Sequence, residues 1–291
     1  MLPLPYPFEL GFMQRALVAS VAVGIFAPMI GTFIVQKRMS LMGDGIGHLA
    51  FAGVGAGVLA WTVMVGVGTF SSVWAVWGAL VVAVIGALGI EWLRARKRAS
   101  GDLALALFFY SWIALGVVLI SLGGGMNASL LIYLFGQPLT VSDSEIVTIL
   151  ALGAAIVTAM LVLRRVLFAV VTDEEWARVA GLPVRFVNDA LAVLVAVSVV
   201  AAMRIVGILL IAAMMVLPVA SGQLLARSFR GTLRWAVAIG VVSAVVGLAA
   251  SRMWGPAPGG TIVLIAAAVF GVVAVVKRGA APPKLSAEEV G

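Results

Sequence analysis

Long, unbroken apolar segments are the feature that most limits how this chain can fold. Nine of them follow one another, each close to the ~20 residues that a helix needs to cross the hydrocarbon core of a bilayer. They lie at 12–35, 47–67, 72–93, 103–122, 145–171, 187–203, 206–226, 233–252 and 261–276. Because 63% of the 291 residues are hydrophobic and only 11% are charged, the sequence predicts a membrane protein that crosses the bilayer many times.

The apolar segments also predict which secondary structure crosses the membrane. Only helices and closed barrels satisfy their backbone polar groups in lipid, and barrel strands alternate apolar with polar residues. The continuous runs therefore predict an all-α transmembrane bundle over residues 1–278. The segment at 187–203 is short, so eight and nine crossings both remain open. Residues 279–291, with their prolines and small or charged side chains, are expected to be a disordered cytoplasmic tail.

The basic residues predict the orientation of the bundle. Of the 19 lysines and arginines, all but Arg15, Arg204 and Arg252 lie in alternate connections or in the tail. The positive-inside rule places those connections, and the C-terminus, in the cytoplasm. The net charge of +7 is therefore explained without a nucleic-acid partner. Arg204 and Arg252 are expected to extend toward the outer membrane interface. Residues 1–7 have no basic region and no small-residue cleavage site, so no signal peptide is predicted.

Missing residue types exclude several functions. The chain has no cysteine, which excludes disulfides, thiolate metal ligands and iron–sulfur centres. It has no Gly-x-x-x-x-Gly-Lys-Ser/Thr loop, so ATP-driven transport would require a separate ATPase polypeptide. An intramembrane metalloprotease needs two histidines in a His-Glu-x-x-His motif, whereas this chain has one histidine. The sequence therefore favours a transport subunit over an enzyme.

Asp44 and His48 form the most informative polar pair. His48 is the only histidine, and both residues lie in a short polar stretch, 37–48, between two apolar segments. In a helix, residues four apart project from the same face. Ionisable residues inside a membrane are costly and usually functional, and carboxylate with imidazole is a ligand set for divalent transition metals. The pair is therefore predicted to contact a metal ion in transit.

A structural role for the same pair is an equally strong interpretation of the residues alone. Asp44 would then cap the second helix, and His48 would donate a hydrogen bond to a backbone carbonyl. Gly43, Gly45 and Gly47 agree with both interpretations, because glycine permits close backbone approach.

The segment 172–183 is predicted to be a short amphipathic helix on the cytoplasmic side. Thr172 or Asp173 would cap its start, acidic residues fill its first turn, and Gly181 followed by Pro183 ends it. This pattern suits an ordinary solvated helix as well as a docking helix.

Four stretches, taken together, resemble the permease subunits of zinc/manganese-type ABC importers, which are relatives of the vitamin B12 and siderophore permeases. They extend over most of the chain, from the first apolar segment to the last. The stretches are 36–44 with 48–50; 133–136 with 139–142; 173–175 with Ala177, Gly181, 206–210 and 217–218; and 258–263.

The resemblance implies a type II importer fold in the bacterial cytoplasmic membrane. It implies a homodimer with a pathway at the interface, two cytoplasmic ATPase subunits and an extracytoplasmic metal-binding protein. The transported ion would be Zn²⁺ or Mn²⁺, with Fe²⁺ as a further candidate and no permanently bound cofactor. Asp44 and His48 would be the metal contacts, and two copies would supply two carboxylates and two imidazoles. Because imidazolium does not bind metal, affinity is expected to fall as the pH drops.

The resemblance also implies an ATPase-coupling helix in the segment 172–183. Its predicted residues are Asp173, Glu174, Glu175, Ala177 and Gly181. Two other functions are weighed against an ABC importer. A secondary transporter could use Asp44 and His48 as a proton relay, but it would leave the acidic segment 172–183 without a role. A permease for an organic substrate would need a wide pathway without a metal-ligand pair.

Overall fold

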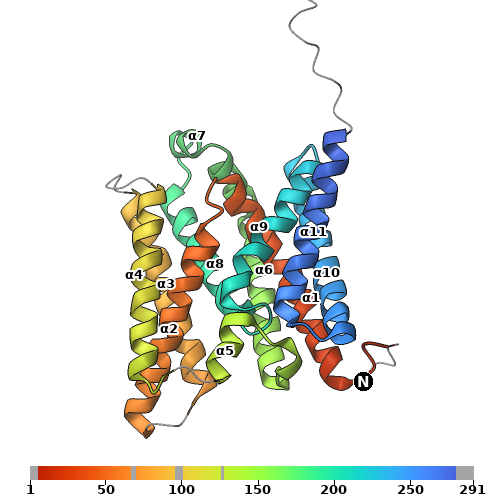
Figure 1. The fold of residues 1–291 in the computed structure, drawn as a ribbon. Helices are drawn as coiled ribbons and strands as arrows, with labels where there is room; N and C mark the ends of the chain where they lie inside the picture. The colour runs from red at the N-terminus through yellow and green to blue at the C-terminus, as the bar shows by residue number, and fades with distance from the viewer. Residues whose placement is uncertain (1–5, 67–69, 96–100, 126–127, 280–291) are drawn as a thin grey trace, which may run out of the picture.

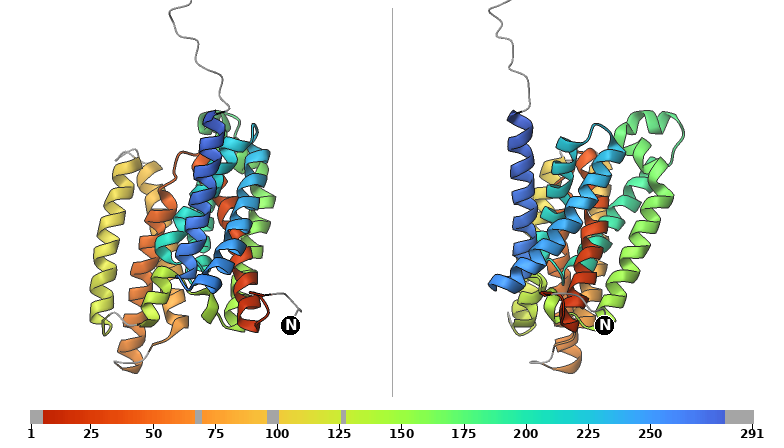
Figure 2. Two further views of the ribbon diagram at one scale, coloured as in Figure 1. Left: turned by 45° about the vertical axis from the view of Figure 1, so that its right-hand side comes forward. Right: turned by 90° about the vertical axis from the view of Figure 1, so that its right-hand side faces the viewer.

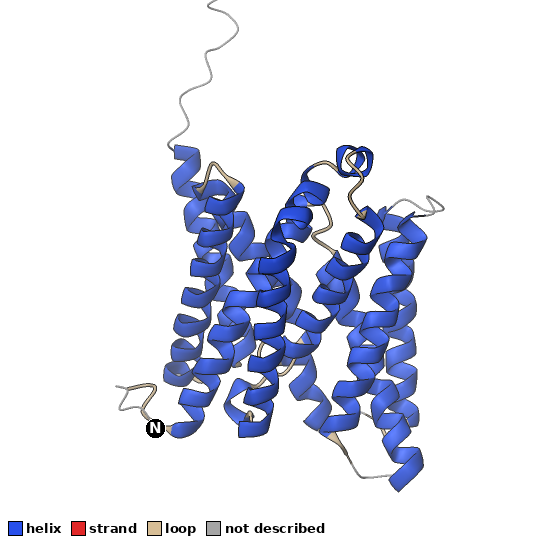
Figure 3. Cartoon of the chain, turned by 180° about the vertical axis from the view of Figure 1, so that it is seen from behind, coloured by secondary structure: helices blue, strands red, loops and turns tan. Residues whose placement is uncertain are grey.

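The computed structural model describes residues 6–66, 70–95, 101–125 and 128–279. The predicted tail from 280 onward lies outside the described residues. Within them the chain forms helices and loops and no strand (Figure 3), so the all-α prediction is confirmed. The helices are α1 Gly11–Gln36, α2 Met42–Val65, α3 Ser72–Ala95, α4 Gly101–Leu122, α5 Ala128–Phe135, the 3₁₀ helix η1 Pro138–Thr140, α6 Asp143–Thr172, α7 Glu174–Val179, α8 Val184–Ala202, α9 Ile208–Leu225, α10 Phe229–Trp254 and α11 Pro258–Gly279.

Seven of the described helices are long and apolar enough to cross a membrane, namely α1, α2, α3, α6, α8, α10 and α11. Shorter apolar stretches lie in α4 and α9, at Phe109–Leu122 and Leu210–Leu225. Each of the nine predicted segments coincides with one of these helices. The expected total of eight to nine crossings stays a prediction.

The long helices run up and down through one bundle (Figure 1). One end of the bundle carries α7 and the connections α1–α2 and α9–α10, and we call it the α7 face. The N-terminus and α5 lie at the other end, the N-terminal face. In Figure 2, α11 lies on the outside of the bundle, and the right-hand view shows α6 on the opposite side. The basic α1–α2 and α9–α10 connections and α7 thus lie at one face of the bundle, as their alternation along the sequence predicts.

Helix α2 begins earlier than the sequence suggested. The second apolar segment was expected from residue 47, whereas the helix starts at Met42. Glycines lower the helix propensity of this stretch, and packing against α9 offsets that loss. A Cβ on Gly43 would lie 3.2 Å from the Met215 sulfur, and one on Gly47 would lie 3.1 Å from the Ile208 carbonyl oxygen. The polar stretch is therefore partly helical, and it carries Asp44 and His48 in its first two turns.

Small residues bring other helices into backbone contact. Gly53 of α2 and Gly78 of α3 each lie against the carbonyl of the other, and Gly24 of α1 is paired with Gly240 of α10 in the same way. Lipid removes the hydrophobic driving force between helices, so close packing of this kind holds membrane bundles together. These contacts fix α2, and with it the polar pair, against the rest of the bundle.

The connection between α8 and α9 is part of a tight junction that we call the glycine junction, made by Gly136, Gly207 and Gly259. Gly136 and Gly207 have φ of +73° and +95°. A Cβ on any of the three would collide with backbone atoms of another segment of the junction. The backbone N–H of Gln137 also donates a hydrogen bond of 2.9 Å to the backbone carbonyl of Arg204. The ends of α5 and α8 and the starts of α9 and α11 are thereby locked together.

Candidate metal site and its surroundings

Asp44 and His48 face each other on α2. Asp44 Oδ1 and His48 Nε2 are 3.8 Å apart, and the side chains are 35% and 12% exposed. The i,i+4 spacing therefore directs the carboxylate of Asp44 and the imidazole of His48 to one point, as the sequence predicts. A metal ion placed near that point would meet one anionic oxygen and one neutral nitrogen, which are donors suited to divalent transition metals.

The structural alternatives receive partial support. Leu41 is the N-cap of α2 and makes no side-chain cap, so Asp44 does not cap the helix by a hydrogen bond. It does lie in the first turn, where a carboxylate is favoured by the helix dipole. Among the described residues, no backbone carbonyl accepts a hydrogen bond from His48. Its ring instead packs edge-on against Phe109 of α4, with centroids 4.2 Å apart.

One copy of the chain supplies too few ligands for a closed metal site. In the described part of the chain, no group of three or more His, Cys, Asp or Glu side chains is placed to hold an ion. Structural zinc sites use four protein ligands, whereas the pair on α2 offers two. The arrangement suits an ion that is bound briefly and completes its shell with water or with groups from another copy.

The predicted amphipathic segment forms α7, which is shorter than expected. The helix covers Glu174–Val179, and Thr172 still belongs to α6. Asp173 is the N-cap, and its carboxylate accepts a hydrogen bond of 2.8 Å from the Trp176 amide. Glu174 and Glu175 fill the first turn. Gly181 has a φ of +77°, with open space around its α-carbon, so it ends the segment by a left-handed turn as predicted.

The exposed residues of α7 are ones that the sequence interpretation missed. Ala177 is fully buried in this chain, whereas Trp176 and Val179 are 60% and 89% exposed. Exposed large apolar side chains at the end of the bundle mark a contact surface better than the buried alanine does. The sequence did contain a sign of this surface, namely a tryptophan and a valine that lie beside charged residues in the helix.

Two arginines in the apolar segments have partners that the sequence did not indicate. Arg204 was expected to extend to the interface, but its guanidinium is only 15% exposed and lies 3.1 Å from Glu145. This acid lies 59 residues away along the chain, so the sequence did not indicate it. Arg15 lies 3.1 Å from Asp143 at the start of α6. Both pairs tie α6 to neighbouring elements at its N-terminal end.

A bundle in which seven of the described helices are long and apolar enough to cross a membrane defines a polytopic membrane protein. Residues 9–277 match the ABC 3 transport family, and the chain belongs to that family. The resemblance to permeases of metal-ion ABC importers is thereby confirmed.

Two curated relatives extend over nearly the same length. The "Manganese transport system membrane protein MntC" of Halalkalibacterium halodurans is 34% identical over 259 residues, which are 89% of this chain and 85% of the relative. The "Manganese import system permease protein ScaB" of Streptococcus gordonii is 30% identical over 259 residues, 89% of each.

Two solved structures share the fold. PsaBC from Streptococcus pneumoniae, solved in complex with Fab, has a TM-score of 0.77 and 31% identity, with 91% of each chain covered. An inward-facing metal-chelate type ABC transporter has a TM-score of 0.68 at 18% identity, with 91% of this chain and 86% of the other covered. The second similarity is one of fold alone.

Proposed function

We propose that this chain is the membrane permease of an ATP-driven importer for divalent transition-metal ions, with Mn²⁺ as the favoured substrate and Zn²⁺ or Fe²⁺ as alternatives. The observation that carries the proposal is the Asp44–His48 pair, 3.8 Å apart on α2, in a chain whose relatives are named as manganese transport proteins. Oxygen and nitrogen donors suit all three ions. The relatives favour Mn²⁺.

The pair would act as a transit site shared by two copies of the chain. Two permeases related by a two-fold axis would bring two carboxylates and two imidazoles to one pathway. The two carboxylates would balance the charge of the ion, and the imidazoles would complete a shell without trapping it. Gly43, Gly45 and Gly47 would support the pathway by holding the start of α2 close to α9.

α7 would dock on the ATPase. The apolar side chains of Trp176 and Val179 would enter a groove on one of two cytoplasmic ATPase subunits, and Asp173 and Gly181 would fix the ends of the docking segment. The permease itself would catalyse no reaction. It would lie in the bacterial cytoplasmic membrane with its C-terminus inside, and an extracytoplasmic metal-binding protein would deliver the ion to the N-terminal face.

The test is Mn²⁺ uptake into proteoliposomes that contain the permease with its ATPase and binding protein. Asp44→Asn and His48→Gln should each lower uptake by about tenfold or more, because each removes a metal ligand. Asp143→Asn is the matched control, since Asp143 is an exposed acid at the other end of the bundle, and it should transport normally. Normal uptake by the Asp44 and His48 variants would reject the transit site. Uptake that needs a proton gradient and no ATP would favour a secondary transporter.

A further inference from the structure

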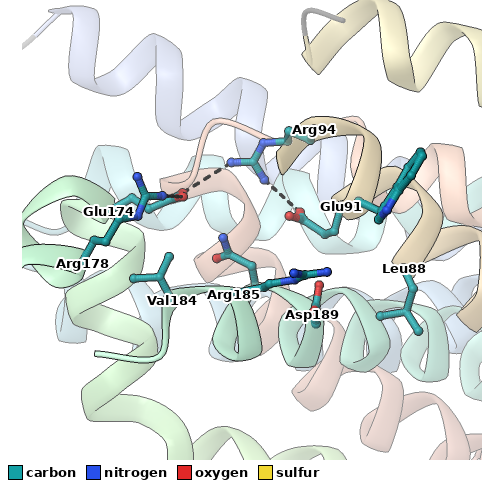
Figure 4. A pocket seen from close by; sticks show the side chains of 10 residues that line it. Leu88, Glu91, Arg94, Glu174, Arg178, Val184, Arg185 and Asp189 are labelled. Carbon is teal, nitrogen blue, oxygen red and sulfur yellow. Dashed lines mark hydrogen bonds and ion pairs between the residues drawn. The ribbon is translucent and has the colours of Figure 1, made fainter. Parts of the chain in front are cut away.

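A pocket of about 650 Å³ opens at the α7 face between α3, α7 and α8. Charged side chains of both signs line it, and Figure 4 shows them pointing toward one another from the three helices. They include Glu91, Arg94, Glu174, Arg185 and Asp189. The metal pair and the docking surface described above use only one of these groups, Glu174.

Glu91, which lines this pocket, forms a deeply buried pair with Lys37, which does not line it. The side chains of Glu91 and Lys37 are each only 6% exposed, and the Lys37 nitrogen lies 3.9 Å from the Glu91 carboxylate. Lys37 also donates a hydrogen bond of 2.7 Å to Asn188 of α8. Buried ion pairs are weak contributors to stability, because desolvation offsets much of their attraction. A buried pair between Lys37, directly after α1, and Glu91 of α3 therefore calls for a role other than packing.

Arg94 joins three separate parts of the structure. Its guanidinium donates a hydrogen bond of 2.8 Å to Glu91 on its own helix, α3. The same group donates to the sulfur of Met39 at 3.0 Å, in the turn between α1 and α2. Its other terminal nitrogen lies 3.6 Å from the carboxylate of Glu174 on α7. One side chain thus contacts the docking helix and the turn that leads into α2.

The turn held by Lys37 and Met39 is short and continues directly into the helix that carries the metal pair. α1 ends at Gln36 and α2 begins at Met42, so Met39 is five residues before Asp44. A displacement of this turn therefore moves the first turn of α2. At the other end of this chain of contacts, Glu174 of α7 pairs with Arg94 across the pocket (Figure 4). The contacts therefore run from α7 through Arg94 to the turn before α2.

We infer that Arg94 and Glu174 are positioning residues that link α7 to the turn before α2, so that movement of α7 on the ATPase is passed to Asp44 and His48. The inference rests on the proposed function. It assigns Glu174 an inward role, toward Arg94, in addition to its place in the docking helix. Coupling between sites of this kind is typically worth five- to 150-fold in an equilibrium, and loss of the link should appear as ATP hydrolysed without metal moved.

The experiment measures ATP hydrolysis and Mn²⁺ uptake together in proteoliposomes that hold the full importer. Glu174→Gln removes the cross-pocket pair, together with the 3.1 Å pair between Glu174 and Arg178 within α7, and leaves Glu91 bound to Arg94. It should lower the number of ions moved per ATP by about fivefold or more, while the ATPase still co-purifies. Arg94→Gln should do the same. The double variant should be no worse than Arg94→Gln alone, because residues on one path are not additive.

Arg15→Gln is the matched control, since it removes an ion pair of the same kind at the N-terminal face, and it should leave the ratio unchanged. Thermal unfolding of Glu174→Gln should match that of the wild type. An unchanged ratio in Glu174→Gln, or an additive loss in the double variant, would overturn the inference. A wild-type importer that moves no Mn²⁺, Zn²⁺ or Fe²⁺ would overturn the proposed function and the inference with it.

Discussion

Gly31 of α1 lies directly against the backbone carbonyl of Met215 in α9, so closely that a Cβ on the glycine would overlap the carbonyl oxygen. Three residues earlier in α9, Ala212 packs against Gly43 of α2. Helix α9 is therefore held between α1 and α2, on the α1 side by a contact that only glycine permits, and its position sets that of the helix that carries Asp44 and His48.

Gly31→Ala should destabilise the bundle by about 1–3 kcal/mol, because the added methyl group has no space and α9 must shift. The measurement is the unfolding temperature of the purified protein in detergent. Gly271→Ala is the control, since Gly271 lies in α11 with open space around its α-carbon, and it should be neutral or stabilising by up to about 1 kcal/mol. Equal unfolding temperatures for the two variants would contradict the close α1–α9 contact.

Gly207→Ala should cost more stability than Gly255→Ala. Gly255 is left-handed, with φ +84° and ψ −2°, where another residue costs about 1–2 kcal/mol. Gly207, with φ +95° and ψ 148°, lies in a region that is essentially open to glycine alone, so its backbone strain in an alanine variant is larger. Gly207 also lies against the backbone of Phe135 and Gly136, whereas Gly255 has nothing within 4 Å. The difference between the two unfolding temperatures measures the steric contribution of the glycine junction together with the larger backbone strain at Gly207. If the two variants unfold alike, the junction is looser than described.

Trp176→Ala should weaken binding of the ATPase by about 2 kcal/mol, or roughly thirtyfold in Kd, because exposed aromatic anchors dominate interface energies. Binding can be measured by titrating the purified ATPase onto the permease in nanodiscs. Trp254→Ala is the control, since Trp254 is 76% exposed at the opposite end of the bundle, and it should bind normally. An undiminished affinity of Trp176→Ala would show that α7 is not the docking helix.

The stability of the bundle should rise between pH 8 and pH 10.5 because of Lys37. Burial lowers the pKa of Lys37 from 10.5 to about 8, although the carboxylate of Glu91 acts in the opposite direction. Within that window the unfolded chain binds the extra proton, so stability contributed by this group increases with pH, and it is constant below pH 8. The gain is at most about 3 kcal/mol.

Lys37→Met provides the comparison for that pH dependence. Other lysines and tyrosines titrate in the same range, so the informative quantity is the difference in unfolding free energy between wild type and variant. This difference should shift in favour of the wild type as the pH rises from 8 to 10.5. A difference that stays constant with pH would mean that Lys37 is charged and well solvated in the folded protein.

The sequence predicted those features that depend on local spacing. Apolar run length identified the long helices, and the i,i+4 spacing brought Asp44 and His48 together. The cap at Asp173 and the turn at Gly181 were also readable, because capping is decided by a few adjacent residues. Helix boundaries were less secure at α2, where three glycines hid a helical start that depends on packing against α9.

The contacts around the pocket could not be predicted, because they join residues far apart in the chain. Lys37 and Asn188 are separated by 151 residues, and Arg94 and Met39 by 55. Hydrophobic periodicity reports which face of a helix is apolar and not which helix lies beside it. The network through Arg94 therefore became visible only once the arrangement of α3, α7 and the α1–α2 turn was known.

The glycine junction also imposes an order on biosynthesis. Gly136 and Gly207 leave the ribosome long before Gly259, yet Gly259 packs against the carbonyls of Phe135 and Val206. The segments around Gly136 and Gly207 contact each other without it, but the junction is complete only once the final helix has been inserted. A nascent chain that stops short of α11 would keep this corner open, and cells could recognise and degrade such unfinished copies.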